Sequence, residues 1–269
     1  MKRILFFFFF SIHTLVFSQR VEDDWENYIV SLNGKPVSIN LNLAFESSKD
    51  FQKNHPFVII HRVKLSCMDQ SGMPKGDERE VLLDMENRMV EFYKAQCKAE
   101  FVGRFTQRGI REFYFYAADT LGYARASQRS MMPFPEHEWL VQAKKDESWD
   151  NYRSVLFPSD IELFRLRNRR KLETLFPDLS KERKQHEFEH IFKVPNEEVQ
   201  KSLMQSEELN GFKIIALQSV PGGKNGEKEL VVSKTEWVDV QWLEKRLVSF
   251  YQVALKKGGT YLGWNLVSK

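Results

Sequence analysis

The sequence predicts an α+β protein, built from two ferredoxin-like β-α-β-β-α-β sandwiches in tandem after a cleaved signal peptide. Three observations lead to this prediction. Strand-like and helix-like apolar patterns follow the same order in both halves of the chain. Turn signals rich in glycine separate neighbouring strand patterns, and a short apolar run opens the chain. The expected boundaries are 1–18 for the signal peptide, 19–145 for the first domain and 146–269 for the second.

The chain begins with MKR and continues with the apolar run ILFFFFFSIHTLVF. A basic start, a short apolar stretch and small or aliphatic residues near the cut, here Val16 and Ser18, are typical of a secretory signal peptide. The uncharged run ends at Gln19 and is shorter than the roughly 18 to 20 residues that a membrane-spanning helix needs. We therefore expect cleavage before Gln19, an exported protein (periplasmic or secreted) and no membrane span after cleavage.

The charge balance bears on possible partners. The formal net charge is +3, and loss of Lys2 and Arg3 with the signal peptide leaves +1. A nearly neutral chain lacks the broad basic surface of a nucleic-acid-binding protein, so no nucleic acid partner is expected. The local exception is the basic run RLRNRRK at 165–171. We interpret it as the solvated face of a helix, with RNA binding as the alternative.

The first half opens with a hairpin, because Asn33-Gly34 separates two alternating runs. A D-x-x-E pattern at Asp77 and Glu80 suggests a capped helix that ends near Cys97. A turn at Arg108-Gly109 joins the next two strands. After the hairpin, the expected order is strand 57–65, helix 77–97, strands 99–107 and 110–118, helix 120–130 and strand 136–144.

The second half is expected to open with a helix at Ser159, where Ser159 and Glu162 form an S-x-x-E capping box. A second helix follows Asn196 and ends at Gly211, and a third ends at Gly258. The remaining elements repeat the order of the first half: strand 186–194, helix 196–210, strands 212–220 and 227–237, helix 238–257 and strand 259–267.

Residues 186–190 read HEFEH, which has the H-E-x-x-H spacing of a zinc peptidase helix. That chemistry needs His186 and His190 on one helical turn and Glu187 as the base. The stretch instead alternates like a strand, and on a strand the two histidines lie about 13 Å apart. We therefore expect no catalytic residue, no metal and no cofactor, and a zinc hydrolase using His186, Glu187 and His190 remains the alternative.

The chain has two cysteines, Cys67 and Cys97. The predicted helix between them separates them by about 30 Å, whereas a disulfide needs Cα atoms within about 7 Å. We expect two free and mostly buried thiols.

The second half carries the motifs FEHIFKVPNEEVQKSL, LNGFKI and GGTYLGW in that order. With these motifs it resembles the RraB family, the regulators of ribonuclease activity B. The resemblance implies inhibition of a ribonuclease by protein contact, without a cofactor. It points to six candidate motif or interaction residues: Glu189, His190, Gly259, Tyr261, Gly263 and Trp264. Leu262 stands where the family has an aspartate. We expect Trp264 to close the core, with an exposed recognition patch formed by Tyr261 and Trp264 as the alternative.

The first half has the motifs WENY at 25–28, GMP at 72–74 and GIREFYFY at 109–116. These resemble an uncharacterised bacterial domain that is often fused in front of RraB-like domains. Together with the signal peptide, the resemblances predict an exported, non-catalytic protein that binds an unknown protein partner. The alternative is an inhibitor of the ribonuclease E type, if the chain stays in the cytoplasm.

Overall fold

The computed structural model describes residues 21–178, 185–220, 226–238 and 240–267. The expected signal peptide, 1–18, lies outside these residues. The chain is α+β and divides into two compact units, 1–157 and 158–269. In the part of the chain that is described, no helix has both the length and the apolar character needed to cross a bilayer.

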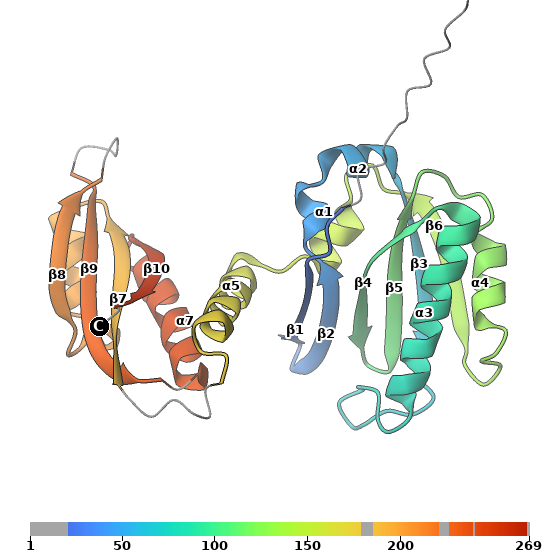
Figure 1. The fold of residues 1–269 in the computed structure, drawn as a ribbon, viewed down its shortest axis with the longest axis horizontal. Helices are drawn as coiled ribbons and strands as arrows, with labels where there is room; N and C mark the ends of the chain where they lie inside the picture. The colour runs from blue at the N-terminus through green and yellow to red at the C-terminus, as the bar shows by residue number, and fades with distance from the viewer. Residues whose placement is uncertain (1–20, 179–184, 221–225, 239, 268–269) are drawn as a thin grey trace, which may run out of the picture. The chain divides into compact units, whose positions relative to one another are not determined.

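The first unit is built on a six-stranded antiparallel sheet (Figure 1). Its strand order is β1-β2-β4-β5-β3-β6. The expected hairpin is confirmed, since Asn33 and Gly34 both adopt positive φ between the first two strands. The strands are β1 (Trp25–Leu32), β2 (Lys35–Asn42), β3 (Phe57–Lys64), β4 (Glu100–Gln107), β5 (Ile110–Ala117) and β6 (Trp139–Lys145).

Both faces of this sheet are covered. Helices α3 (Glu78–Cys97) and α4 (Tyr123–Met131) pack together over one face, where they bury an apolar cluster around Ile59 and Phe115. The opposite face carries the short helices α1 (Ala44–Ser47) and α2 (Lys49–Asn54) and a π-helical turn, Tyr152–Leu156. A sheet covered on both sides explains why this unit is rich in buried aromatic residues.

The expected boundary at residues 145 and 146 is wrong, because the segment 146–157 belongs to the first unit. Trp149, Tyr152 and Leu156 are fully buried there. The indole of Trp149 stacks on Tyr116 of β5 with 3.7 Å between ring centroids. The Tyr28 hydroxyl of β1 donates to the Leu156 carbonyl at 2.7 Å. These contacts complete the second face of the sheet.

Two local expectations in the first unit also need correction. Asp77 precedes α3, but its backbone is already helical and its side chain makes no capping hydrogen bond. Glu78 instead accepts a hydrogen bond from the Ser66 amide at 3.1 Å. Both cysteines are free, as expected, but Cys67 is exposed and only Cys97 is buried.

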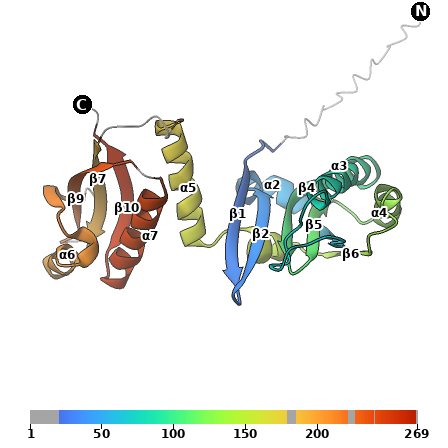
Figure 2. The same ribbon diagram turned by 90° about the horizontal axis from the view of Figure 1, so that it is seen from below.

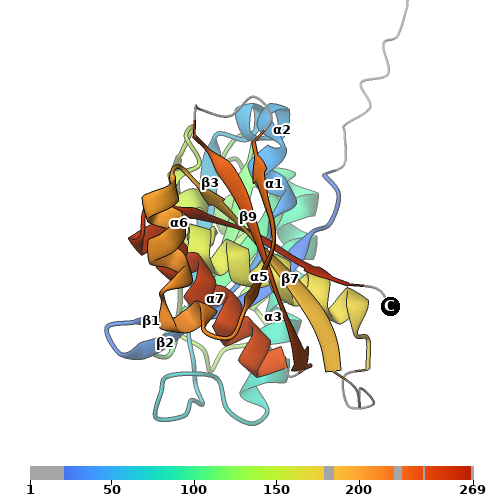
Figure 3. The same cartoon turned by 90° about the vertical axis from the view of Figure 1, so that its left-hand side faces the viewer.

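The second unit has a four-stranded antiparallel sheet in the order β10-β7-β9-β8. The central strands β7 and β9 run alongside each other (Figure 3). Helices α6 and α7 lie on the same side of the sheet (Figure 2). The elements are α5 (Asp160–Leu175), β7 (Gln185–Val194), α6 (Glu197–Met204), β8 (Lys213–Ser219), β9 (Lys228–Trp237), α7 (Val240–Lys256) and β10 (Thr260–Leu266).

Two predicted helix caps in this unit are confirmed. The Glu162 amide donates to the Ser159 hydroxyl at 3.4 Å, and the Val199 amide donates to Asn196 Oδ1 at 2.9 Å. Alternate residues of β7 and β9, such as Phe188, Phe192 and Val232, form one core with residues of α5, α6 and α7. All three helices therefore contribute to the same face of the sheet.

Candidate functional site

Five of the six residues indicated by the sequence lie on two neighbouring strands, and the sixth directly precedes one of them. Glu189 and His190 belong to β7, and Tyr261, Gly263 and Trp264 belong to β10, which pairs with it. Trp264 is opposite His190, and Gly263 is opposite Ile191. Gly259 directly precedes β10, where an added Cβ would come within 3.1 Å of the Lys193 carbonyl oxygen. The sheet thus brings the six residues together along one strand pair.

Three of the six, His190, Tyr261 and Trp264, point into the core. His190 is 0% exposed, and its Nδ1 shares a hydrogen bond of 2.8 Å with the Tyr261 hydroxyl. Burial, and then the nearby positive charges of Arg246 and Lys171, lower the pKa of His190 to about 3. Burial also raises the pKa of Tyr261 well above its usual value. This histidine is therefore neutral and shielded from solvent, as befits a core residue.

Trp264 is 2% exposed, so the expectation that it closes the core is confirmed. Its indole Nε1 donates to Asn168 Oδ1 of α5 at 2.6 Å. The ammonium group of Lys171 lies 4.4 Å from the centroid of the Trp264 ring and also donates to the Trp264 carbonyl. The predicted basic run 165–171 therefore lies on a helix, and its last residue serves to hold Trp264 in place.

HEFEH lies within the strand β7. The helical turn that a zinc peptidase requires is therefore not formed. Among the described residues, no group of three or more His, Cys, Asp or Glu side chains could hold a metal ion.

The face of the second sheet that points away from the helices carries Glu189 and Gly263, and we call it the open face. Side chains alternate along a strand, so Glu189 and Ile191 of β7 face away from the core that His190 enters. The Ser233 hydroxyl of β9 donates to Glu187 Oε1 at 3.0 Å, which confirms that these two side chains share this open face. A Cβ built on Gly263 would meet no atom within 4 Å. This face is open at the centre of the strand pair that the sequence singled out.

An apolar row crosses this open face from one edge strand to the other. The register aligns Gly263 with Ile191, Ile191 with Val231, and Val231 with Ala216. Both edge strands have a register shift at this level, between 261 and 263 in β10 and between 214 and 216 in β8. By alternation from Tyr261 and Ile214, whose partners Phe192 and Val232 face the core, the extra residues Leu262 and Ile215 fall on the open face. We call the four side chains the cross-strand row: Leu262, Ile191, Val231 and Ile215.

The ends of the row are the most exposed. Leu262 is 48% exposed and Ile215 is 51% exposed, whereas Ile191 and Val231 are half-buried between their neighbours. Apolar residues that form a contiguous exposed patch mark contact sites more often than single ones do. The sequence did not identify this row, because only the register brings the four residues into line.

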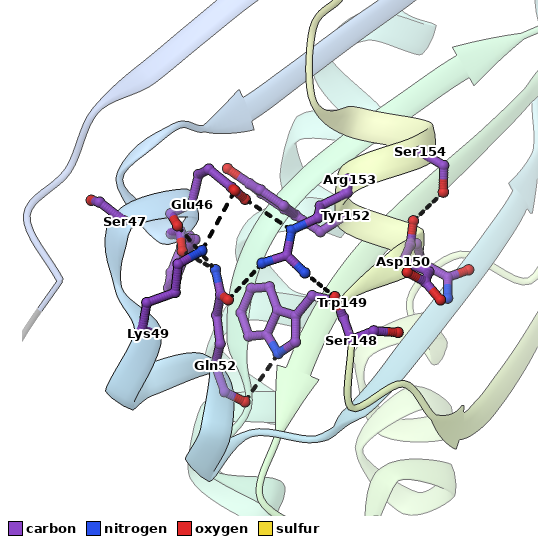
Figure 4. Close-up of polar contacts among 12 residues, drawn as sticks. Glu46, Ser47, Lys49, Gln52, Ser148, Trp149, Asp150, Tyr152, Arg153 and Ser154 are labelled. Atoms are coloured by element: carbon purple, nitrogen blue, oxygen red, sulfur yellow. Dashed lines mark hydrogen bonds and ion pairs between the residues drawn. The ribbon is translucent and has the colours of Figure 1, made fainter.

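In the first unit, the notable polar cluster is structural. Figure 4 shows the Arg153 guanidinium between the loop before it and the helices α1 and α2. It donates to Glu46 Oε2 at 3.2 Å, to Gln52 Oε1 at 2.8 Å and to the Ser148 carbonyl. The Trp149 indole donates to the Gln52 carbonyl at 3.1 Å. All these groups are used to attach the segment 146–157, so the cluster offers no free acid or base.

A histidine in the first unit repeats the arrangement around His190. His61 of β3 is 0% exposed, and its Nδ1 lies 3.1 Å from the Tyr93 hydroxyl. Burial lowers the pKa of His61 to about 3. In each unit, the first strand of the β-α-β-β-α-β order thus carries a buried histidine that shares a hydrogen bond with a tyrosine.

Among curated proteins, no sequence matches this chain. Several solved structures are weakly similar to it, two of which are described here. One, described as "Crystal structure of putative glycine cleavage system transcriptional repressor", has 6% identity and a TM-score of 0.24, over 79% of this chain and 98% of that one. The other, an unknown protein from Galdieria sulphuraria, has 9% identity and a TM-score of 0.20, over 78% and 96%.

At these TM-scores neither structure informs the fold or the function. The sequence comparison with protein families is more informative. Residues 23–157 match the family described as "Family of unknown function (DUF695)". The match covers half of the chain and coincides with the first compact unit, including the segment that ends at Phe157. The chain belongs to the DUF695 family.

Proposed function

We propose that this is an exported, non-catalytic protein that binds another protein chain through the open face of its second sheet. The cross-strand row carries the proposal. It presents four apolar side chains in line, two of them about half exposed, on the face that α5, α6 and α7 leave uncovered. Burial of such a row against a partner removes apolar surface from water, which is the main driving force of protein association.

The strand order supports the ferredoxin-like interpretation of both units. In the second unit, the strands lie side by side in the order β10-β7-β9-β8. Numbered by their sequence order within the unit, this is 4-1-3-2. In the first unit, β6-β3-β5-β4 has the same order, with the hairpin β1-β2 added beside β4. This is the order of a split β-α-β sandwich. It also supports the resemblance of the second unit to RraB-like domains, which implies action by protein contact.

The surroundings of the candidate residues support a role without catalysis. A general acid or base must reach the group it protonates or deprotonates, and His190 and Tyr261 are buried within the core. The remaining candidates, Glu189 and the glycines, offer no nucleophile with an adjacent base. The apolar N-terminal run supports export. An exported chain does not meet a cytoplasmic ribonuclease, so we propose a partner outside the cytoplasm.

The test is capture of partners from the exported fraction with the mature chain, 19–269, as bait. A double substitution of Ile191→Lys and Val231→Lys should abolish capture, because it places two charges in the middle of the row. Leu255→Lys is the matched control, since Leu255 is 68% exposed on α7, away from the open face. The control should retain the partner. Equal recovery with both variants, at equal thermal stability, would exclude the open face as the binding site.

A further inference from the structure

The residues that flank the cross-strand row carry charges of both signs. On the open face, one line of residues runs across the four strands on each side of the cross-strand row. The first line includes Glu189 of β7, and the second includes Lys193 of β7 and Glu229 of β9. Lys193 also pairs with Glu227 of its own chain at 3.2 Å. By register, the first line is Asn265, Glu189, Ser233 and Lys213, and the second is Thr260, Lys193, Glu229 and Gln218.

This pattern is complementary to itself. If two copies stack face to face with a two-fold axis along the row, the two flanking lines exchange places, and Glu189 of one copy faces Lys193 of the other. If the two-fold axis instead runs parallel to the strands, β7 of one copy lies over β9 of the other. Lys193 of one copy then faces Glu229 of the other. Within the eight residues of the two lines, neither arrangement places like charges opposite each other. Avoidance of like charges is a main source of specificity at interfaces.

The apolar residues also match under both axes. With the axis along the row, Ile191 and Val231 each meet their own counterpart. With the axis along the strands, Ile191 meets Val231, and Leu262 meets Ile215. In each case the row is covered by another apolar row, and the two sheets form a sandwich with a spacing of about 10 Å.

We propose that the protein chain bound by this open face is a second copy of the same chain. The inference rests on the proposed function and names its partner. Four strands spaced ~4.8 Å apart and seven residues long at ~3.3 Å each give a face of roughly 440 Å² per copy. Two such faces total about 900 Å², which is below the size typical of permanent complexes. The dimer is therefore reversible and depends on concentration.

The first experiment is sedimentation velocity of the full mature chain, 19–269, from roughly 1 to 100 µM. The expected result is a shift from monomer to dimer within this range. Ile191→Lys with Val231→Lys should remain monomeric, and Leu255→Lys should dimerise like the parent. A parent chain that is monomeric throughout, or a dimer that the double substitution leaves intact, would overturn the inference.

A charge exchange then tests the stacking itself. Lys193→Glu should weaken the dimer about tenfold, since it turns one attractive charge pair in each half of the interface into a pair of facing glutamates. Addition of Glu189→Lys should restore it if the axis follows the row, and addition of Glu229→Lys should restore it if the axis follows the strands. Circular dichroism melts of each variant verify folding. Rescue by neither partner substitution overturns stacking of the two faces.

The two proposals fail in different ways. If the chain stays monomeric but its capture of a foreign protein still requires Ile191 and Val231, the second copy is the wrong partner and the binding face stands. If neither dimerisation nor capture responds to these two residues, the open face has no binding role and both proposals fail.

Discussion

Truncation within the segment 146–157 should decide where the first domain ends. A chain ending at Lys145 loses Trp149, Tyr152 and Leu156, all fully buried against the sheet. Removal of a large buried side chain costs about 2 to 5 kcal/mol, so the three together amount to roughly 6 to 15 kcal/mol. A domain of this size is stable by about 5 to 15 kcal/mol in total. The fragment 19–145 should therefore not fold, whereas 19–157 should.

Urea denaturation followed by circular dichroism distinguishes the two fragments, and single substitutions in 19–157 refine the result. Trp149→Ala should cost about 3 to 5 kcal/mol. Arg153→Met should cost less than Trp149→Ala, because the Arg153 side chain is 36% exposed and its ion pair with Glu46 is screened by water. What it does lose is the hydrogen bond to Gln52 Oε1. If 19–145 unfolds cooperatively at the same midpoint as 19–157, the segment adds nothing and the reasoning is wrong.

Three further predictions concern single residues. Trp264→Ala should destabilise the fragment 158–269 by about 3 to 5 kcal/mol, and a thermal melt within a degree of the parent would contradict its place in the core. The pKa of His190 falls from 6.5 in the unfolded chain to about 3 in the folded chain. Below pH 6.5 the unfolded chain therefore binds a proton that the folded chain does not, and the free energy of unfolding decreases as the pH falls from 6.5 towards 3. At pH 5 the loss is about 2 kcal/mol, and His190→Gln in 158–269 should flatten the pH dependence of urea denaturation between pH 6.5 and 5. Cys67 should react with a thiol reagent in the native protein, whereas Cys97, which is buried and has a pKa raised by burial, should react only after unfolding; equal rates would contradict the difference in exposure.

Local patterns predicted most of the individual elements. The alternation in HEFEHIFKV predicted the strand β7 and thereby argued against a zinc helix, as the structure confirms. Asn33-Gly34 and Arg108-Gly109 predicted two tight turns, and all four residues adopt positive φ. These features depend on side chains and backbone within a few residues of each other. The sequence therefore contains the information needed to find them.

The domain boundary depends on contacts that are distant in the sequence. The segment 146–157 follows the last strand of the first sheet, and its aromatic pattern alone does not say which unit it joins. Trp149 is buried because Tyr116 of β5 offers its ring and Gln52 and His55 offer carbonyl oxygens. Asp146 also fixes the segment: burial disfavours its charged form, but hydrogen bonds from Tyr116, Asn151 and Asp150 outweigh this effect and lower its pKa.

The open face of the second unit could not be predicted for a different reason. Strict alternation of side chains would place Leu262 on the same face as Trp264, and so would not assign it to the open face. The register shift between Tyr261 and Gly263 breaks this alternation. Tyr261 and Trp264 can therefore both enter the core, while Leu262 remains exposed. A second shift, in β8, exposes Ile215 at the same level of the sheet. One such irregularity would leave a single exposed residue, but two at opposite edges extend a continuous apolar row across all four strands. Bulges at sheet edges commonly redirect side chains for function, and their coincidence here is the physical reason for assigning the binding face to this side of the sheet.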